Sequence, residues 1–485
     1  MKKTALSAIL AVLCLSSIVS CGDSTAAKTP AVTQASTETE AVTEAIDDRG
    51  YPAPDTSNYD FGGQTVHFIA PEWSNYTYYY TEELDGEAVN DAAFNRLSNV
   101  KNALNVEIEW VWSTDANTHT DVRKTITAGD DAYDIVFTHS VYGLNDYAST
   151  HSLYNLDVLP NVDFNAPWWS RSMMDDFRIG SETYYAYGDI ILSANRCVFF
   201  NKTIANDNDM PDHYQLVRDG KWTYDVFLSE AKSISNDVNG DGKIDVNDMT
   251  GFAGDLTESL CNVPYAFGKR ITKTTNDSIV LDFYDDKMLD IFKKTYDYFT
   301  DSNVSNGYFR QKTDIQQGFD EGLALFTFST ISGMADLRES NVDFGTLPYP
   351  KYDEAQENYI TYAWPTFVCV PTTITRPELV GAALEQFAYE SKPVRDAFYE
   401  ILIRGKSTRD VESLEMMDII DSSVTCESTS SYLAFDQSYH KLFYVFLELL
   451  PDKKSDLSSH YAKCEKGVQK VIDKLYDDII SAQEN

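Results

Sequence analysis

The segment TVHFI at residues 65–69 is an apolar run of strand length, preceded by two glycines. Apolar residues then recur at helical spacing over 93–104, and the next segment, 106–110, alternates apolar and polar side chains as a half-buried strand does. A short helical segment at 122–128 leads to a third strand-like run, YDIVF at 133–137. This β-α-β-α-β order requires right-handed crossovers and predicts a parallel sheet covered by helices.

Two loops of the predicted sheet carry aromatic residues among polar ones. Ligands of such sheets bind beyond the carboxyl ends of the strands, which here are followed by the loops at 71–76 and 138–142. Trp73 and Tyr142 offer flat rings that stack on the apolar face of a sugar, and His139 can hydrogen-bond its hydroxyls. The sequence therefore predicts a sugar-like ligand. The alternative is that the two rings cap the sheet edge and that His139 is a surface or capping residue.

A second series of elements follows Pro160 and is identified by its apolar periodicity. No internal repeat is present. In chain order, we expect a strand pair at 184–189 and 197–202, helices at 224–235, 287–299 and 315–319, strands at 324–328 and 361–370, and helices at 377–387, 433–450 and 461–480.

The amino terminus has the pattern of a lipoprotein signal peptide. Lys2 and Lys3 precede the apolar run 5–12, and a small residue stands before Cys21. Residues 1–20 are therefore predicted to be removed, leaving Cys21 as a lipidated terminus that anchors the chain to the extracytoplasmic face of a cell membrane. The alternative is an ordinary signal peptide with an incidental cysteine. Residues 21–58 are rich in Thr, Ala, Ser and Glu without apolar periodicity, and predict a flexible stalk.

Composition narrows the classes of partner. The chain has 485 residues, 43% of them hydrophobic, which is enough for more than one domain core. Acidic residues outnumber basic ones 76 to 39, so the formal charge is -37 and nucleic acid is not expected as a partner. Beyond Cys14 and Cys21 an odd number of cysteines remains, widely spaced, and this does not indicate a disulfide framework.

The most specific motif is DVNGDGKIDVND at 237–248, which matches the spacing of a calcium loop. A shorter Asp replaces the usual Glu at its last position, and Gly251 and Gly254 disfavour the exiting helix of a paired sensor. The motif predicts a structural Ca²⁺ clip, the alternative being an unoccupied Asx-rich turn. The expected ligands are Asp237, Asn239, Asp241, the Lys243 carbonyl, Asp245 and Asp248.

Several further segments, taken in their order along the chain, resemble the extracellular solute-binding lipoproteins of bacterial ABC importers (family 1), which include the maltose receptors. The resemblance covers about residues 59–480. It rests on DFGGQ at 60–64, APWWS at 166–170, YGDI at 187–190, FFNK at 199–202, GKWTYD at 220–225 and FGTLP at 344–348.

This resemblance implies an α/β, two-lobed fold of the periplasmic-binding-protein type (type II), with a cleft between the lobes. Lobe one would comprise 59–178 and 350–405, and lobe two 179–349 and 406–485. It further implies a lipid-anchored, monomeric receptor that binds a small-molecule solute, foremost a carbohydrate or oligosaccharide, and delivers it to ABC permease subunits.

The family places polar ligand contacts on a segment that here holds Asp189, Asn195 and Arg196, and aromatic contacts on late cleft loops, where Trp364 and Tyr432 stand. Asp189 is equally suited to a buried structural hydrogen bond. Trp168 and Trp169, beside Pro167 at the expected lobe crossover, are expected to be structural residues.

A secreted glycosidase and a surface adhesin are the alternatives from other classes. The 76 acids contain many carboxylate pairs that a glycosidase needs, although the chain has no Gly-x-Ser-x-Gly or His-Glu-x-x-His motif. An adhesin would present a flat exposed patch instead of a cleft. The sequence favours a binding protein that is not an enzyme.

Overall fold

The first sheet is built around β1 (Gln64–Pro71), whose apolar residues are buried on both faces. In the computed structural model, β1 pairs in parallel with β2 (Val106–Ser113) along its whole length and with β3 (Ile135–His139) on its other side. The connecting helices are α1 (Ala88–Leu104) and α2 (Thr118–Ala128). The predicted β-α-β-α-β order is therefore confirmed.

The structure describes most of the chain beyond Tyr51, and these residues belong to one compact unit, Ile46–Asn485. The predicted signal peptide, Cys21, most of the stalk, Trp73, Lys243, Asp245 and most of the 315–319 helix lie outside the described residues. Those described are 52–72, 78–114, 118–192, 195–242, 244, 247–253, 259–275, 278–301, 304, 318–334, 337, 340–404 and 411–483.

The predicted strand at 361–370 is two separate strands. β10 (Thr361–Tyr362) pairs with β12 (Val424–Thr425), whereas β11 (Thr366–Cys369) runs antiparallel to β3 and completes the order β11-β3-β1-β2. Pro365 stands between them, and because proline has no backbone N–H it cannot continue a ladder. Apolar character alone did not reveal this break.

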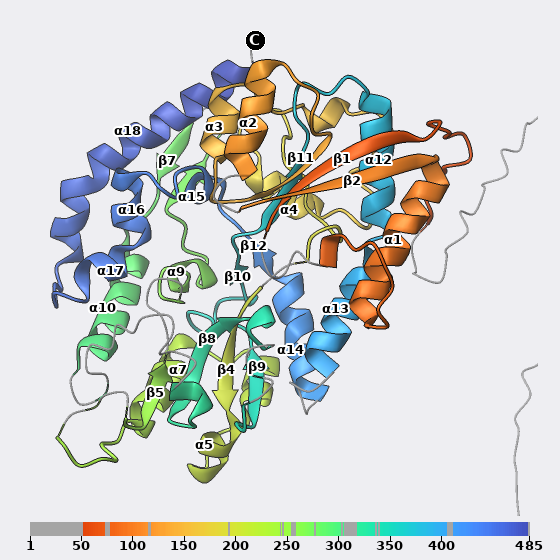
Figure 1. The fold of residues 1–485 in the computed structure, drawn as a ribbon. Helices are drawn as coiled ribbons and strands as arrows, with labels where there is room; N and C mark the ends of the chain where they lie inside the picture. Colours follow the sequence, from red (N-terminus) through yellow and green to blue (C-terminus); the bar gives the residue numbers. More distant parts are fainter. Residues whose placement is uncertain are drawn as a thin grey trace, which may run out of the picture. The chain divides into compact units, whose positions relative to one another are not determined.

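The second four-stranded sheet has the order β5-β8-β4-β9 and lies apart from the first, with β10 and β12 between the two (Figure 1). Its strands are β5 (Thr250–Ala253), β8 (Ala324–Thr330), β4 (Arg196–Asn201) and β9 (Phe344–Leu347). Residues 184–189 are not the hairpin partner that we expected for β4. In the described residues β4 pairs with β8 and β9, and Ala186 bridges to Val368 of β11.

Helices cover both sheets. The helices α4 (Arg171–Phe177), α12 (Pro377–Tyr389) and α13 (Lys392–Arg404) accompany the first sheet: α4 packs Phe177 on Phe367 of β11, α12 contacts β1 and α13 packs on α1. The second sheet is accompanied by α7 (Tyr224–Ile234), which contacts β5, and by α14 (Val411–Ser422), which contacts β9. The other elements are α3 (Leu144–Ser149), η2 (Leu156–Val158), α5 (Lys202–Asp207), α6 (His213–Arg218), α9 (Val263–Ala266), β6 (Thr272–Thr274), β7 (Ile279–Leu281), α10 (Asp286–Thr300) and η3 (Ile331–Met334).

The predicted helix at 433–450 is also divided. Tyr444, at φ −102° and ψ 36°, leaves helical geometry between α16 (Gln437–Phe443) and α17 (Val445–Leu449). α15 (Ser428–Tyr432) precedes them and α18 (Leu457–Gln483) ends the described chain. Among the described residues, no helix has the length and apolar character needed to cross a membrane.

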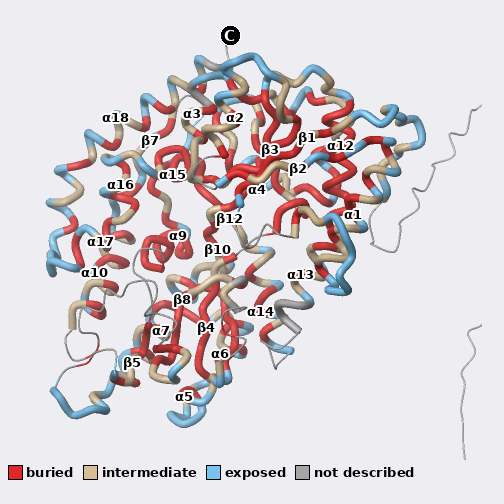
Figure 2. The backbone as a smooth tube through the Cα atoms, viewed as in Figure 1, coloured by how far each residue is buried: buried red, intermediate tan, exposed pale blue. Residues whose placement is uncertain are grey.

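The buried residues gather in the strands of both sheets and in the inner faces of the surrounding helices (Figure 2). In the second sheet the core is largely aromatic: the buried ring of Trp222 packs against Phe227 and Phe326, with centroids 6.1 and 5.5 Å away. Buried aromatic side chains contribute a large apolar area, so each sheet has its own hydrophobic core. The boundaries of the two predicted lobes stay a prediction.

Gly381 provides a test of how α12 packs. A Cβ atom there would lie 1.8 Å from the carbonyl oxygen of Pro160, so Gly381→Ala should lower the free energy of unfolding by about 1–3 kcal/mol. In α18, a Cβ on Gly467 would meet Ser438 only at 3.9 Å, and Gly467→Ala should stabilise by about 0.5–1 kcal/mol. Chemical denaturation of both variants measures these shifts, and equal stabilisation by both would contradict the close approach.

Candidate functional site

An aromatic cluster forms where β3 ends and β11 begins. We define it as His139, Tyr142, Trp364 and Phe435, together with the guanidinium of Arg196. The ring of Tyr142 lies with its centroid 5.6 Å from that of His139 and 5.5 Å from that of Phe435. The Cζ atom of Arg196 lies 5.3 Å from the centre of the Trp364 ring. One edge of the first sheet thus holds His139, Tyr142 and Trp364, three residues whose rings were predicted from the sequence to bind ligand.

Antiparallel pairing brings these distant residues together. His139, at the carboxyl end of β3, stands opposite Thr366, the first residue of β11. The Ser140 amide donates to the carbonyl of Pro365 across 2.8 Å, which fixes Trp364 beside the end of β3. Arg196 reaches the same place from β4, a strand of the second sheet. The cluster therefore contains groups from both sheets.

His139 is a neutral hydrogen-bonding group in this setting. The Val141 amide donates to its Nδ1 across 3.4 Å, which places the ring proton on Nε2. Burial lowers the pKa of His139 to about 3, and the positive charge of Arg196 lowers it further. The side chain is thus a hydrogen-bond donor without a charge over the physiological range.

Phe435 was missed by the sequence analysis. It is 66% exposed, an unusual state for a phenylalanine, and its ring faces that of Tyr142. It lies in the turn between α15 and α16, where the periodicity had predicted a continuous helix. Asp436 next to it is the N-cap of α16, accepting from the Ser438 and Tyr439 amides, and this capping residue was the available signal for a turn.

Asp189 and Asn195 lie in a different place. Both line a cavity of about 330 Å³ that also contacts α4, α13 and α14, here called the junction cavity. Asp189 is 5% exposed and forms an ion pair with Arg395 of α13. The Asn195 amide donates to Asp421 Oδ1 across 2.5 Å, and the Tyr399 hydroxyl donates to the same oxygen across 3.2 Å.

Asn195 and Arg196 are adjacent in sequence yet serve the two different places. Successive side chains of an extended chain point to opposite sides, and this segment is extended as it enters β4. Asn195 lines the junction cavity, and Arg196 lies over Trp364. The predicted ligand residues therefore divide into two groups on either side of one chain segment.

Tyr432 does not lie in the aromatic cluster. It ends α15 instead of beginning a helix, is 7% exposed, and its ring stacks on Phe177 with centroids 5.5 Å apart. Tyr185 and Phe177 both pack around it, so the structure makes Tyr432 a core residue. A ligand-binding role for Tyr432 therefore stays a prediction.

Trp168 and Trp169 are buried, at 4% and 6% exposure, and hold the crossing segment to α12. The Trp169 Nε1 donates to Glu385 Oε2 across 2.9 Å. Burial raises the pKa of Glu385 to about 7, although the indole and amide donors oppose that rise. The structural role expected for these tryptophans agrees with this packing.

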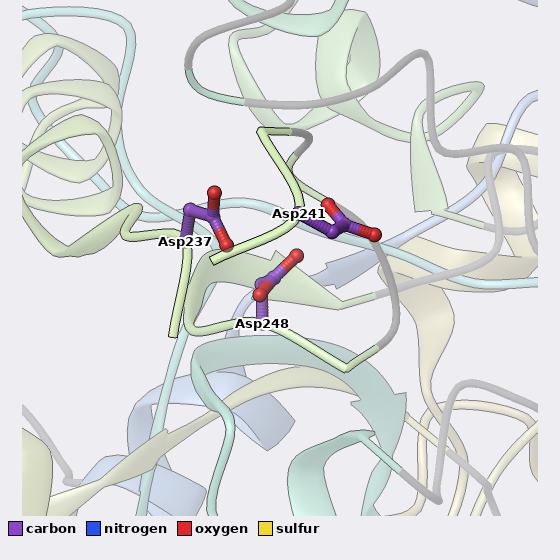
Figure 3. Close-up of side chains that lie close together, drawn as sticks. All are labelled: Asp237, Asp241 and Asp248. Atoms are coloured by element: carbon purple, nitrogen blue, oxygen red, sulfur yellow. The ribbon is translucent and has the colours of Figure 1, made fainter. Parts of the chain in front are cut away.

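The metal-like loop gathers three carboxylates. Oxygen atoms of Asp237, Asp241 and Asp248, one from each side chain, lie within 4.8 Å of one another, and Figure 3 shows the three carboxylates close together. Asp248 is 1% exposed, and its Oδ1 accepts from the Val238 amide across 3.0 Å. The loop runs from α7 into strand β5, closed by the bridge between Asn236 and Met249, so no exiting helix follows, as predicted.

These oxygens are of the hard type that Ca²⁺ prefers. Asn239 Oδ1 accepts from the Asp241 amide across 2.9 Å, which turns that side chain back onto the loop. The loop backbone also donates to Asp237, from Gly240 across 2.6 Å and from Gly242 across 2.7 Å. The donor set fits a divalent cation, with Lys243 and Asp245 outside the described residues.

Solved structures with a similar fold include an ABC substrate-binding protein and a cyclo/maltodextrin-binding protein. UspC of M. tuberculosis matches with a TM-score of 0.58 at 11% sequence identity, covering 84% of this chain and 99% of that one. The ABC substrate-binding protein Lmo0181 from Listeria monocytogenes, in complex with cycloalternan, matches at 0.55 and 11% identity over 84% and 99%. A cyclo/maltodextrin-binding protein complexed with maltotetraose matches at 0.57 and 13% identity, over 84% and 97%.

The likeness extends over nearly the whole of each of these proteins, so the predicted two-lobed α/β fold of the periplasmic-binding-protein type is confirmed. At these identities the match concerns the fold. No protein-family model matches the chain, and no curated protein matches it by sequence.

The low pKa of His139 predicts a loss of stability in acid. Between about pH 6.5 and pH 3 the unfolded chain binds a proton at this residue that the folded chain does not bind. The free energy of unfolding should therefore fall as the pH falls through this window, by about 1.4 kcal/mol per pH unit for one proton. His139→Gln removes this contribution, so its stability relative to wild type should improve steadily from about pH 6 to pH 4 in urea titrations. A constant difference between the two proteins would contradict the assignment.

Proposed function

We propose that the protein is an extracytoplasmic receptor that captures a carbohydrate and delivers it to an ABC permease. The aromatic cluster is the observation that carries this proposal. The exposed ring of Phe435 and the partly buried rings of Tyr142 and Trp364 lie beside the uncharged donor His139 and the guanidinium of Arg196. Stacking faces and hydrogen-bonding groups are thus offered together, which is the combination a sugar ring requires. Proteins of the same fold are described in complex with cycloalternan and with maltotetraose, which supports a sugar as the ligand.

Capture would depend on contact with both lobes. His139 belongs to the first sheet and Arg196 to the second, so a sugar held by the cluster contacts groups of each. A ligand shifts an open–closed equilibrium only by its differential affinity for the two states. A solute that contacts both sheets makes all of its contacts only when the two sheets approach each other. Binding therefore favours the closed arrangement of the two lobes.

Binding without catalysis fits the composition of the cluster better than hydrolysis does. A glycosidase places two carboxyl groups across the sugar, whereas the five residues of the aromatic cluster include one cation and no acid. The recessed position of His139, only partly exposed at the end of a buried strand, also differs from the flat patch expected of an adhesin. The lipid anchor at Cys21, the cleaved signal at 1–20 and a monomeric state complete the proposal.

Removing a ring of the cluster should weaken sugar binding. Trp364→Ala and Phe435→Ala each lose one stacking face, and the dissociation constant for a maltooligosaccharide or another bound glycan should rise about tenfold. Tyr284→Ala is the matched control, because this ring is 37% exposed and stacks on Tyr461 instead, with centroids 4.7 Å apart.

Calorimetric titration against a glycan panel measures these affinities, and product release is followed in the same samples. Turnover of the glycan without stoichiometric binding would refute the receptor. Unchanged affinity in both cluster variants would place the sugar elsewhere.

We also propose that the 237–248 loop binds a structural Ca²⁺. The convergence of Asp237, Asp241 and Asp248 supports this, since three carboxylates so close together repel one another unless a cation lies among them. Asp237, Asn239, Asp241, Asp245, Asp248 and the Lys243 carbonyl are the proposed ligands. The bound ion would tie the end of α7 to the start of β5 and so stabilise one edge of the second sheet.

Calcium should raise the melting temperature of the wild-type protein, since an ion that binds only the folded chain stabilises it by mass action. Asp241→Asn should reduce that rise strongly, with little effect in chelator because Asp241 is exposed. Asp452→Asn, an exposed acid paired with Lys454, is the control and should keep the full calcium response. An equal loss of stability by Asp241→Asn with and without calcium would argue against the metal.

A further inference from the structure

The junction cavity is a built polar chamber, set apart from the aromatic cluster. Its volume of about 330 Å³ is at the lower end of the range of small-molecule pockets. None of the five cluster residues lines it, because Asn195 and Arg196 face opposite sides of the chain. The sugar site proposed above therefore does not account for it.

Charged groups of the junction cavity have hydrogen-bonding capacity to spare. Arg395 is about one-third exposed and donates through Nη1 to Asp189, and within the described residues its Nη2 and Nε make no hydrogen bond. Asp421 accepts twice at Oδ1, from Asn195 and Tyr399, and its Oδ2 has no partner within the described part of the chain. Arg395 and Asp421 both line the chamber, so these N–H groups and this carboxylate oxygen are available for hydrogen bonds to a ligand.

The chemistry of the cavity selects the class of ligand. Asp189, Asp421 and Arg395 sum to one negative charge, so an anion is disfavoured there. Burial raises the pKa of Asp421, with the nearby Arg395 opposing the rise. An anion bound beside Asp421 would make the ionised carboxylate less stable still. A simple cation is disfavoured as well, because it cannot accept a hydrogen bond from the N–H groups of Arg395. A hydroxyl both donates and accepts, and so can pair with both residues at once.

The walls complete the match to a compact polyhydroxylated molecule. Ser170, Ser172 and Ser422 bring hydroxyls to the lining, and Trp168 and Tyr187 bring apolar ring surface. Polar groups that fix hydroxyls beside apolar rings are what a small polyol needs. We propose that the junction cavity is a second binding site, which takes one uncharged polyol of the size of a monosaccharide, held between Arg395 and Asp421.

The junction cavity lies between segments that pack with different sheets, so a ligand bound there affects how the two sheets are arranged. Asp189 and Arg395 belong to segments that pack with the first sheet, since Ala186 bridges to β11 and α13 packs on α1. Asn195 leads into β4, and α14, which carries Asp421, packs on β9 of the second sheet. A polyol that bridges Arg395 and Asp421 would stabilise one relative arrangement of the two sheets. It would thereby change the affinity of the aromatic cluster, and that cluster's ligand would change the affinity of the cavity by the same factor.

The test uses the full mature chain and a probe panel of D-glucose, D-galactose, D-xylose, glycerol and myo-inositol at millimolar concentration. The proteins are wild type, Asp421→Asn, Arg395→Met, Ser422→Phe and Trp364→Ala. At least one probe should bind Trp364→Ala as it binds wild type, and bind Asp421→Asn and Arg395→Met about tenfold or more weakly. Ser422→Phe, which fills the cavity without altering a charge, should abolish binding. Circular dichroism confirms that each variant is folded.

Four outcomes would overturn the second site. No probe binds the wild-type protein, or binding survives in both charge variants, or it survives Ser422→Phe, or Trp364→Ala abolishes it. The last outcome would assign the polyol to the aromatic cluster and would leave the receptor function standing. If the wild-type protein binds a polyol but no glycan of the panel, the receptor proposal alone is refuted, so the two failures are distinguishable.

Discussion

The hydrogen bonds between β10 and β12 hold together the segments that join the two sheets. The Thr361 amide donates to the Ser423 carbonyl and the Ala363 amide to that of Thr425, each across 3.0 Å. The first strand precedes β11 of the first sheet, and the second follows α14, which packs on the second sheet. Backbone that crosses a buried junction must satisfy its polar groups there, and a short ladder does so in little space. Trp364 and the junction cavity residue Val424 are both placed by it.

The charged side chains around this junction are each paired with a group on a different element. Arg395 on α13 meets Asp189 of the crossing segment, and Asp421 on α14 meets Asn195 before β4. Groups removed from water in this way are costly unless they are paired. A cavity lined by such pairs is polar and is formed by segments that pack with each of the two sheets, whereas the neighbouring cluster is aromatic and carries a single cation. The adjacent residues Asn195 and Arg196 thus belong to two chemically distinct places.

Local pattern predicted the elements well where one period ran without interruption. The strands around 65–69, 106–110 and 133–137 and the long carboxyl-terminal helix formed as expected. Prediction failed where a single residue breaks a period: Pro365 divides an apolar run between two ladders, and Tyr444 divides a helix. Of the ligand residues, His139, Tyr142 and Trp364 lie together, but Tyr432 is core, and Phe435, Arg395 and Asp421 carried no functional signal in the sequence.

The amino-acid sequence by itself determined the α/β character of the chain, its acidic charge and the oxygen spacing of the 237–248 loop, because each of these depends on residues close together in the chain. Tertiary structure decided which side chains meet: His139 opposite Thr366, Arg196 over Trp364, and Arg395 against Asp189. Such contacts depend on strand register and on where the chain crosses between sheets. The energy that selects them comes from burying distant apolar surfaces together, which no local pattern records.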